Sequence, residues 1–365
     1  MRPIFKILIA ITIVAVLGVT IYFLVAGGND EVVTPVNPEG KDEATTETTV
    51  GGSILKQISD ETVFDFWVNP ETKEVFYFTP EGRVINAKQG PDIEVSNQKV
   101  NALNFVEISP SNRNALAAFG NPRTPQWGIF DVIDGVWRPL PSDVINAAWG
   151  VSDEKLIAIV KSGNDLNLAE VDITKSPPSY KTIIRDFRLK DVRFTTLSDG
   201  IIIVSEFPSA IYAGSLWQID PKSSNVNLII APEEGLSISW SHDKNLAFVF
   251  GSNSGFSLME NSLRTKAPTS FETLPWKCTT DSSLIYCFVP QNTPSDTVLP
   301  DDYLMDKFFS IDDLFILGIN SEESSKVLSS NTAGINAIDA KNPQVSGDKI
   351  YFINRYDNNL YELSL

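Results

Sequence analysis

Residues 239–250 read SWSHDKNLAFVF: a short apolar stretch, a polar turn and a second apolar run. The same order of residue types occurs seven times between Trp67 and the C-terminus. The other copies are WVNPETKEVFYF (67–78), EISPSNRNALAAF (107–119), WGVSDEKLIAIV (149–160), TTLSDGIIIVS (195–205), KCTTDSSLIYCF (277–288) and QVSGDKIYFIN (344–354). The turns recur roughly every 40 to 46 residues, with one longer gap before the last, and this period is typical of propellers with four-stranded blades. We therefore predict an all-β, seven-bladed β-propeller.

Further strands are expected after each copy. In the unit that starts at Ser239, the third strand is predicted near residues 255–261 and the fourth near 270–274. The last unit is short by one strand, because the chain ends at Leu365 after NLYELSL. The segment SILKQIS (53–59) occupies the position that an outer strand holds before a new blade. Both chain ends are therefore predicted to pair in one sheet, which leaves fewer free edges.

The N-terminal residues 1–28 are predicted to form a transmembrane anchor. Residues 7–26 contain 20 residues without a charge, enough to cross a bilayer as a helix. Arg2 and Lys6 precede this run, whereas Asp30 and Glu31 follow it, so the positive-inside rule leaves the N-terminus in the cytoplasm. A cleaved signal peptide is the alternative, but its apolar region is usually shorter and ends in a small-residue cleavage site. We expect a single-pass protein of the cytoplasmic membrane with everything after the anchor outside the cytoplasm.

Residues 29–52 and 53–365 are the other two predicted segments. The first is acidic, rich in Thr, Gly and Pro and poor in aromatics, which predicts a flexible stalk. The second holds all of the repeats and is the predicted propeller. The net charge of −17 argues against nucleic acid as a partner, since a phosphate-binding face needs clustered Lys and Arg. The acidity more simply keeps the protein soluble and dispersed.

The turn sequences carry a resemblance to a known family. SPSN at Ser109, VSDEK at Val151, LSDG at Leu197 and SHDK at Ser241 are similar to the SPDG turn of TolB-like β-propellers, although none is a perfect SPDG. The resemblance covers about residues 53–365 and implies a propeller that binds protein or ligand in the bacterial envelope. With its anchor and stalk, the chain also looks like uncharacterised bacterial membrane-anchored propeller proteins. The family supplies no catalytic residue to transfer.

The chain contains few residues suited to catalysis or metal binding. His242 is the sole histidine and stands in a turn, where a structural role is expected, and no GxSxG elbow or phosphate-binding loop follows a strand. Cys278 and Cys287 are the two cysteines; a hairpin would place them on adjacent strands. They would form a disulfide on the oxidising side of a membrane, or pack as two buried thiols. They lack the ligand number for a metal site.

Tryptophan recurs just before the polar turn in four units. Trp67, Trp149, Trp240 and Trp276 are candidates for stacking on sugar rings. Their regular positions instead predict packing between blades.

One segment interrupts the repeat. Residues 289–313 separate the second and third strands of one blade and are longer than the matching connections elsewhere. Insertions in repeat proteins map to loops on one face, often the binding face, so this loop is predicted to lean over the central channel. The candidate ligand- or partner-binding residues are Asp301, Asp302, Tyr303, Asp306, Phe308 and Phe309. A solvated loop, or one packed onto its own blade by its aromatic residues, is the alternative.

The sequence thus predicts a non-catalytic scaffold that docks an envelope protein or peptide on this face. No cofactor is predicted; Asp301, Asp302 and Asp306 offer carboxylates for Ca²⁺, but their spacing fits no defined loop. An enzyme that processes a glycan or peptide, with Asp301 and Asp306 as acid and base, is the alternative, although no carboxylate pair of suitable separation is evident. A third reading is an assembly part that spaces complexes along the membrane. The oligomeric state does not follow from the sequence.

Overall fold

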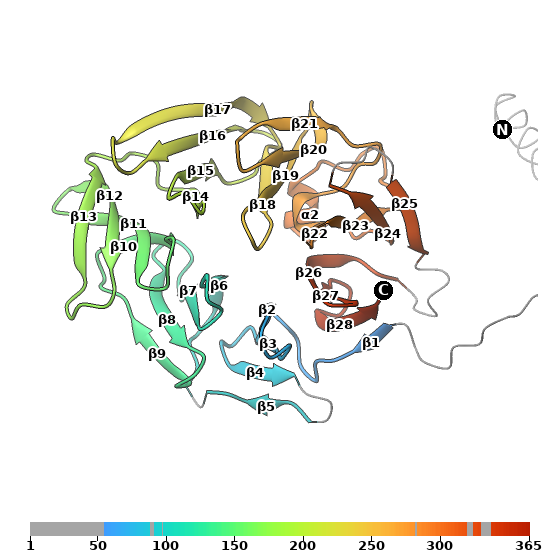
Figure 1. Cartoon of the computed structure of the whole chain (residues 1–365), viewed down its shortest axis with the longest axis horizontal. Coiled ribbons are helices and arrows are strands. Elements are labelled where there is room, and N and C mark those ends of the chain that lie inside the picture. Colours follow the sequence, from blue (N-terminus) through green and yellow to red (C-terminus); the bar gives the residue numbers. More distant parts are fainter. Residues whose placement is uncertain (1–54, 88–90, 97, 282, 320–323, 330–336) are drawn as a thin grey trace, which may run out of the picture. The chain divides into compact units, whose positions relative to one another are not determined.

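The computed structural model describes residues 55–87, 91–96, 98–281, 283–319, 324–329 and 337–365. Seven antiparallel sheets of four strands each form a ring around a central channel, with the first strand of each sheet toward the centre (Figure 1). The predicted seven-bladed β-propeller is confirmed. Blade 7 is completed by the first strand of the described chain.

The strands follow one another in chain order from blade 1 to blade 7. Blade 1 contains β2 (Asp65–Val68), β3 (Val75–Phe78), β4 (Val84–Ala87) and β5 (Ile93–Glu94), and blade 2 contains β6 (Leu103–Ile108), β7 (Asn114–Phe119), β8 (Gln126–Asp131) and β9 (Val136–Pro139). Blade 3 contains β10 (Val144–Trp149), β11 (Lys155–Ser162), β12 (Asp165–Asp172) and β13 (Ser179–Ile184), and blade 4 contains β14 (Val192–Thr196), β15 (Ile202–Glu206), β16 (Ala213–Asp220) and β17 (Asn225–Glu234).

The last three blades carry the short helices. Blade 5 contains β18 (Ser237–Trp240), β19 (Leu246–Gly251), β20 (Gly255–Glu260) and β21 (Thr265–Pro268), and the 3₁₀ helix η1 (Pro275–Lys277) leads into blade 6. Blade 6 contains β22 (Cys278–Thr280), β23 (Leu284–Pro290), α2 (Asp301–Leu304), β24 (Asp312–Gly318) and β25 (Ser324–Ser329). Blade 7 contains β26 (Ala340–Ser346), β27 (Lys349–Asn354), β28 (Asn359–Ser364) and β1 (Leu55–Gln57).

The ring is closed by its two chain ends, as predicted. Strand β1 pairs antiparallel with β28, with Leu55 opposite Leu363 and Gln57 opposite Tyr361. The backbone N–H of Ile58 then donates to the carbonyl of Leu360 at 2.8 Å. Of the predicted segment 53–59, residues 53 and 54 lie outside the described residues. The pairing removes a free edge from blade 7.

The central residues of the second strand of each blade are apolar because both faces of the strand are covered. In β19, Leu246, Phe248 and Phe250 pack with residues of blade 6. The intervening Ala247 and Val249 pack with residues of blade 4. Successive side chains of a strand point to opposite faces, so a strand between two neighbouring blades needs apolar residues at every position. This requirement explains why the repeat was recognisable as a continuous apolar run.

One strand was predicted at the wrong place. The outer strand of blade 5 is β21, five residues before the expected segment 270–274. Leu274 of that segment is 2% exposed and belongs to the core between blades 5 and 6. The Thr273 hydroxyl donates to the Phe288 carbonyl at 2.6 Å. The apolar residues of this segment therefore serve packing between blades rather than strand pairing.

The two faces of the ring carry different connections. The turns between first and second strands lie on one face, which we call the turn face. The loops between second and third strands and the connections between blades lie on the other, which we call the loop face. The fourth turn position has a positive φ in three blades, at Asn112 (60°), Gly200 (89°) and Lys244 (59°). Glycine adopts this conformation at little cost, which accounts for the Gly of the SPDG pattern.

The predicted anchor (1–28) and stalk (29–52) lie outside the described residues. Within the ranges given above, no helix has the length and apolar character needed to span a bilayer.

Candidate functional site

The predicted binding loop runs from 291 to 311 between β23 and β24, and it is anchored rather than free. Tyr303 and Phe308 are buried, whereas Phe309 is 40% exposed. The carboxylate of Asp301 accepts the backbone N–H of Ala210, in the loop between β15 and β16, at 2.8 Å. Asp302 accepts the N–H of Val298 at 2.8 Å within its own loop. The loop therefore contacts blade 4 across the loop face.

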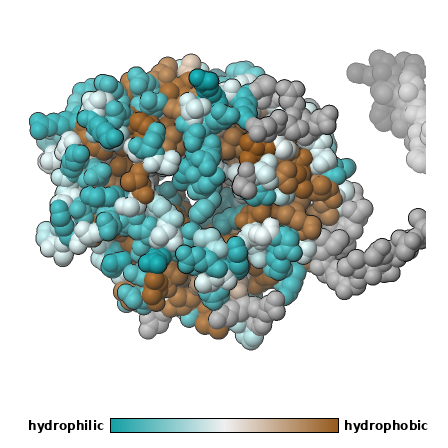
Figure 2. All heavy atoms as spheres, in the orientation of Figure 1, coloured by the Kyte–Doolittle hydropathy of each residue, from teal (hydrophilic) through white to brown (hydrophobic). Residues whose placement is uncertain are grey.

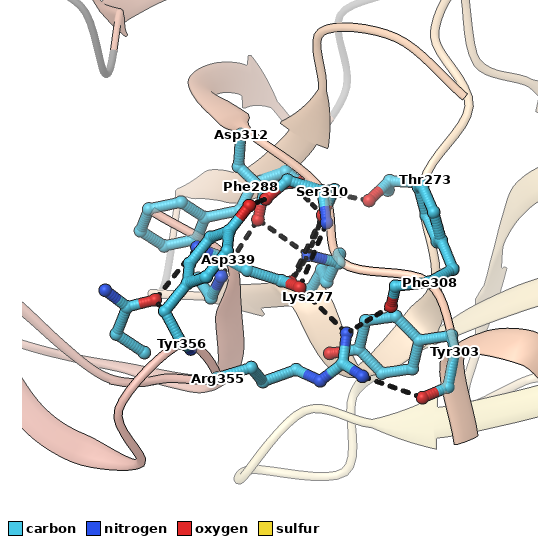
Figure 3. Close-up of polar contacts among 12 residues, drawn as sticks. Thr273, Lys277, Phe288, Tyr303, Phe308, Ser310, Asp312, Asp339, Arg355 and Tyr356 are labelled. Carbon is cyan, nitrogen blue, oxygen red and sulfur yellow. Dashed lines mark hydrogen bonds and ion pairs between the residues drawn. The ribbon is translucent and has the colours of Figure 1, made fainter. Parts of the chain in front are cut away.

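Arg355 of blade 7 holds the other end of this loop (Figure 3). Its guanidinium donates to the carbonyls of Tyr303 (2.8 Å) and Phe308 (3.2 Å) and to the carboxylate of Asp306 (2.7 Å). The same group lies 3.6 Å from the centre of the Tyr303 ring. Three predicted site residues, Tyr303, Asp306 and Phe308, therefore meet around one arginine of the neighbouring blade. These three residues therefore fit the alternative prediction of a loop that packs onto its own blade, except that they contact blade 7 as well as blade 6.

Beneath the loop lies a group of buried charges that we call the buried network: Lys277, Ser310, Asp312, Asp339 and Arg355 (Figure 3). The Lys277 ammonium donates to Asp312 and Asp339, both at 2.6 Å, and to the Ser310 hydroxyl at 3.0 Å. Asp339 also accepts from Arg355 at 2.8 Å. The side chains of Lys277, Asp312 and Asp339 are all 0% exposed.

The buried network is electrostatically costly and fully paired. Burial raises the pKa of Asp312, and the attraction of Lys277 opposes that rise. Burial likewise raises the pKa of the Tyr303 hydroxyl well above its usual value, with Asp339 adding to the effect. Charges without solvent are tolerated when each has a partner, and removing one partner leaves an uncompensated charge. The network therefore joins blades 6 and 7 and holds the loop in place.

Asp301 and Asp306, the carboxylates predicted as an alternative acid and base, form different contacts. Asp301 binds an amide of blade 4 and Asp306 pairs with Arg355, so the two carboxylates serve different partners. In the part of the chain that the structure describes, no group of three or more His, Cys, Asp or Glu is placed to hold a metal ion.

Above the anchored loop, apolar side chains remain exposed on the loop face. Ile211 is 71% exposed and Tyr212 77% exposed in the blade 4 loop that Asp301 contacts. The Phe309 and Tyr356 rings lie 5.6 Å apart. We call this group the docking surface: Ile211, Tyr212, Leu304, Met305, Phe309 and Tyr356. It combines loops of blades 4, 6 and 7.

The two cysteines lie directly opposite each other on β22 and β23. Their sulfur atoms are joined in a disulfide in the structure. Both residues are buried in the core between blades 5 and 6. Cys278 follows Lys277, so the disulfide and the buried network stabilise adjacent parts of blade 6.

The central channel holds charged residues that sequence reasoning missed. A cavity of about 410 Å³ opens among blades 2 to 5, and two others, of about 270 and 280 Å³, lie along the same channel. Glu107 and Lys244 line all three. Both residues lie beside the repeated turns of the sequence. The signal that could have identified Lys244 is a Lys at a turn position that is otherwise suited to Gly. Figure 2 shows one face of the ring, with hydrophilic residues predominant around the centre.

Glu107 connects blades 2 and 3 at the channel wall. Its carboxylate accepts the backbone N–H of Trp149 at 3.1 Å, and its carbonyl accepts the Trp149 indole N–H at 2.9 Å. Burial raises the pKa of Glu107, and Lys244 opposes the rise. Trp149 and Trp67 are buried as predicted, and Trp240 and Trp276 are partly buried; all four border the channel cavities. His242 is exposed in its turn at the channel wall.

Comparison with known proteins agrees with this architecture. No family model matches the sequence, and no curated protein matches it. Among solved structures the chain is similar to the tricorn protease (TM-score 0.53, 9% identity, covering 92% of this chain and 35% of that one). It is also similar to the Myceliophteria thermophila Cps50 (Swd1) β-propeller domain, with a TM-score of 0.53 and 10% identity over 85% of this chain and 99% of that one. A chain of a mitotic checkpoint complex matches with a TM-score of 0.53 and 15% identity over 93% of this chain and 99% of that one. The chain thus spans about a third of the tricorn protease chain. At these identities the similarity shows the fold alone: a β-propeller.

Proposed function

We propose that this chain is a membrane-anchored, extracytoplasmic propeller of the TolB-like kind that docks a protein or peptide of the cell envelope without catalysis. The observation that supports it best is the docking surface on an anchored loop face. Large apolar side chains, two of them more than 70% exposed, stand on loops fixed by Arg355 and Asp301. Preorganised apolar and aromatic groups give affinity at a low entropic cost. Propellers are also frequent protein-binding modules, and one similar chain comes from a multiprotein complex.

The extracytoplasmic location rests on two features. The uncharged run 7–26 and its flanking charges favour a single-pass anchor with the propeller outside the cytoplasm. The Cys278–Cys287 disulfide suits an oxidising compartment. A thiol-alkylation assay would test it on cells that are quenched in acid and then denatured, because denaturation exposes the buried pair: the two cysteines should resist alkylation until a reductant is added. Immediate alkylation of both thiols would contradict an oxidising location.

Docking is tested by replacing exposed residues of the docking surface while the contacts that anchor its loops stay intact. We expect the triple variant I211S/Y212S/M305S of the full chain to lose a crosslinked envelope partner while it retains the melting temperature of the wild type. These side chains are exposed, so their replacement removes binding area but little core. Deletion of residues 289–313 is unsuitable, because it removes Ser310 and Asp312 from the buried network.

A matched control is available on the opposite face. Ile133 is 73% exposed in the turn between β8 and β9, on the turn face. The variant I133S removes a similar apolar group and should leave partner recovery unchanged. Equal recovery by the triple variant and the wild type would contradict docking at this surface.

A further inference from the structure

The cavity of about 410 Å³ at the loop-face end of the channel gathers positive charge in an acidic protein. Its lining includes four basic side chains and two acidic ones: Arg123, Lys190, Arg193, Lys244, Glu107 and Asp191. The formal charge of this lining is therefore 4 − 2 = +2, against −17 for the whole chain. Since clefts lined by one sign of charge concentrate ions of the other sign, the cavity favours anions.

Within the described residues, the basic groups of this cavity have no close ionic partner, although Lys244 attracts the Glu107 carboxylate from a longer distance. None of the four forms an ion pair there, whereas the basic residues of the buried network are fully paired. The guanidinium of Arg193 lies 5.2 Å from the centre of the Phe207 ring and makes no hydrogen bond to the described residues. Arg193 remains exposed at the cavity wall, and partial desolvation by the surrounding protein lowers its pKa. An unpaired cation in such surroundings gains from an incoming anion.

Lys244 lines the cavity from the turn between β18 and β19. It stands in the left-handed region (φ 59°) at the turn position that is Gly200 in blade 4. This conformation disfavours side chains other than Gly and Asn, yet a Lys occupies it and lines the cavity. Nine other non-glycine residues of the described chain have a positive φ, among them Lys73 in the blade 1 turn, so Lys244 contributes to the site through its charge rather than through strain.

The other walls limit the kind of anion. Aromatic residues form much of the lining: Phe105, Trp127, Phe194, Phe207 and Trp240. Glu107 and Asp191 would repel a highly charged ion such as phosphate, so a singly charged group is favoured. The volume lies within the range of small-molecule sites, roughly 300 to 1,000 Å³.

We propose that this cavity binds a carboxylate that is attached to an aromatic or aliphatic group, with Arg193 pairing with the carboxylate, Lys244 adding to the positive potential of the cavity and the aromatic wall contacting the apolar part. The carboxylate belongs either to a free organic acid or to the C-terminus of a peptide. The cavity and the docking surface share no residue, although Phe207 stands in the same blade 4 loop as Ile211 and Tyr212, and binding in the cavity does not depend on docking.

Calorimetric titration of the full chain, purified in detergent, tests the proposal with two matched pairs of probes. The first pair is 3-phenylpropionate and its neutral amide; the second is a short peptide ending in Phe with a free or an amidated C-terminus. We expect the acid of at least one pair to bind about tenfold or more tightly than its amide, because only the acid pairs with the cations. The pair with the greater difference identifies the source. Equal binding of acid and amide in both pairs, or no saturable binding of either acid, would overturn the proposal.

Variants locate the site. R193Q should weaken binding of the preferred acid about tenfold and leave the amide unchanged, since it removes one charge–charge contact. R188Q is the matched control: Arg188 belongs to the connection between blades 3 and 4, is highly exposed and pairs with Asp186 outside the cavity. It should bind the acid as the wild type does. Unchanged acid binding by R193Q would also overturn the proposal, and the comparison of acid with amide on the wild type does not depend on how any variant folds.

Discussion

Two groups of charged side chains, one between blades 6 and 7 and one along the channel, are arranged in opposite ways. In the buried network between blades 6 and 7, Lys277 and Arg355 are each matched by carboxylates at 2.6 to 2.8 Å, out of contact with solvent. In the cavity among blades 2 to 5, Arg193 and Lys244 face an open volume and form no close ion pair with the described residues, although Lys244 attracts Glu107 at longer range.

The difference shows how a structural charge cluster is told from a candidate binding site. Paired, buried charges already have all of their ionic partners within the protein and do not bind a ligand. Their removal is expected to affect stability. Unpaired charges that face a cavity contribute little to stability, and their removal is expected to affect binding. The insertion loop that attracted attention in the sequence belongs largely to the first class, whereas the inconspicuous turn at Ser241–Lys244 belongs to the second.

The largest effect is expected in the buried network. K277M should lower the free energy of unfolding by about 3 to 5 kcal/mol, because it leaves buried carboxylates without their cation. Chemical denaturation of the full chain measures it. The control is K326M in the same blade: Lys326 pairs with Asp313 but is 51% exposed, so less than about 1 kcal/mol is expected. Similar losses in both variants would show that the network has no special structural role.

Removal of the disulfide beside the buried network is expected to cause a smaller loss of stability. The variant C278A/C287A should be less stable by about 2 to 3 kcal/mol, the chain-entropy estimate for so short a loop. Wild type in reductant should approach the variant, while the variant itself should not respond to reductant. A variant as stable as oxidised wild type would show that strand pairing alone holds the hairpin.

Asp306, at the exposed edge of the buried network, should contribute still less to stability. D306N should cost about 1 kcal/mol, because Asp306 is 73% exposed and Arg355 keeps its contact with Asp339. Asn also tolerates the positive φ of 53° at this position, so the backbone is preserved. Thermal unfolding provides the measurement. A loss as large as that of K277M would place Asp306 among the essential buried charges.

The smallest effect is expected to have the opposite sign. K244G should raise the free energy of unfolding by up to about 1 kcal/mol, because Gly adopts a positive φ without the strain of a side chain and the lost attraction to Glu107 offsets only part of this gain. The control K161G, at an exposed site in the extended strand β11, should instead cost about 0.5 to 1 kcal/mol. Destabilisation by K244G would mean that the Lys244 side chain stabilises the fold, and the contrast between the two charge groups would fail.

Local patterns in the sequence predicted most of the ring. Continuous apolar runs such as LAFVF at 246–250 mark second strands because both faces of these strands are covered, and the polar turn before each run fixes its start. The same regularity predicted closure by residues 53–59 and the facing positions of Cys278 and Cys287. Residues 270–274 were misassigned because the packing of Leu274 between blades looks the same in sequence as a strand.

The site was less predictable for a physical reason. Lys277, Asp312, Asp339 and Arg355 stand in four separate segments, and nothing local to any of them indicates the others. The loop residues Tyr303, Asp306 and Phe308 were identified as distinctive, but Arg355 of another blade determines their role.

The sequence by itself determined the number of blades, their strand order and the closure of the ring, because these follow from hydrophobic periodicity and turn chemistry within about 40 residues. Only the tertiary structure decided which charges are paired and which face the channel. That distinction depends on distances between side chains of different blades, and the free energy of a charge depends on its partners and its access to water rather than on its neighbours in the chain.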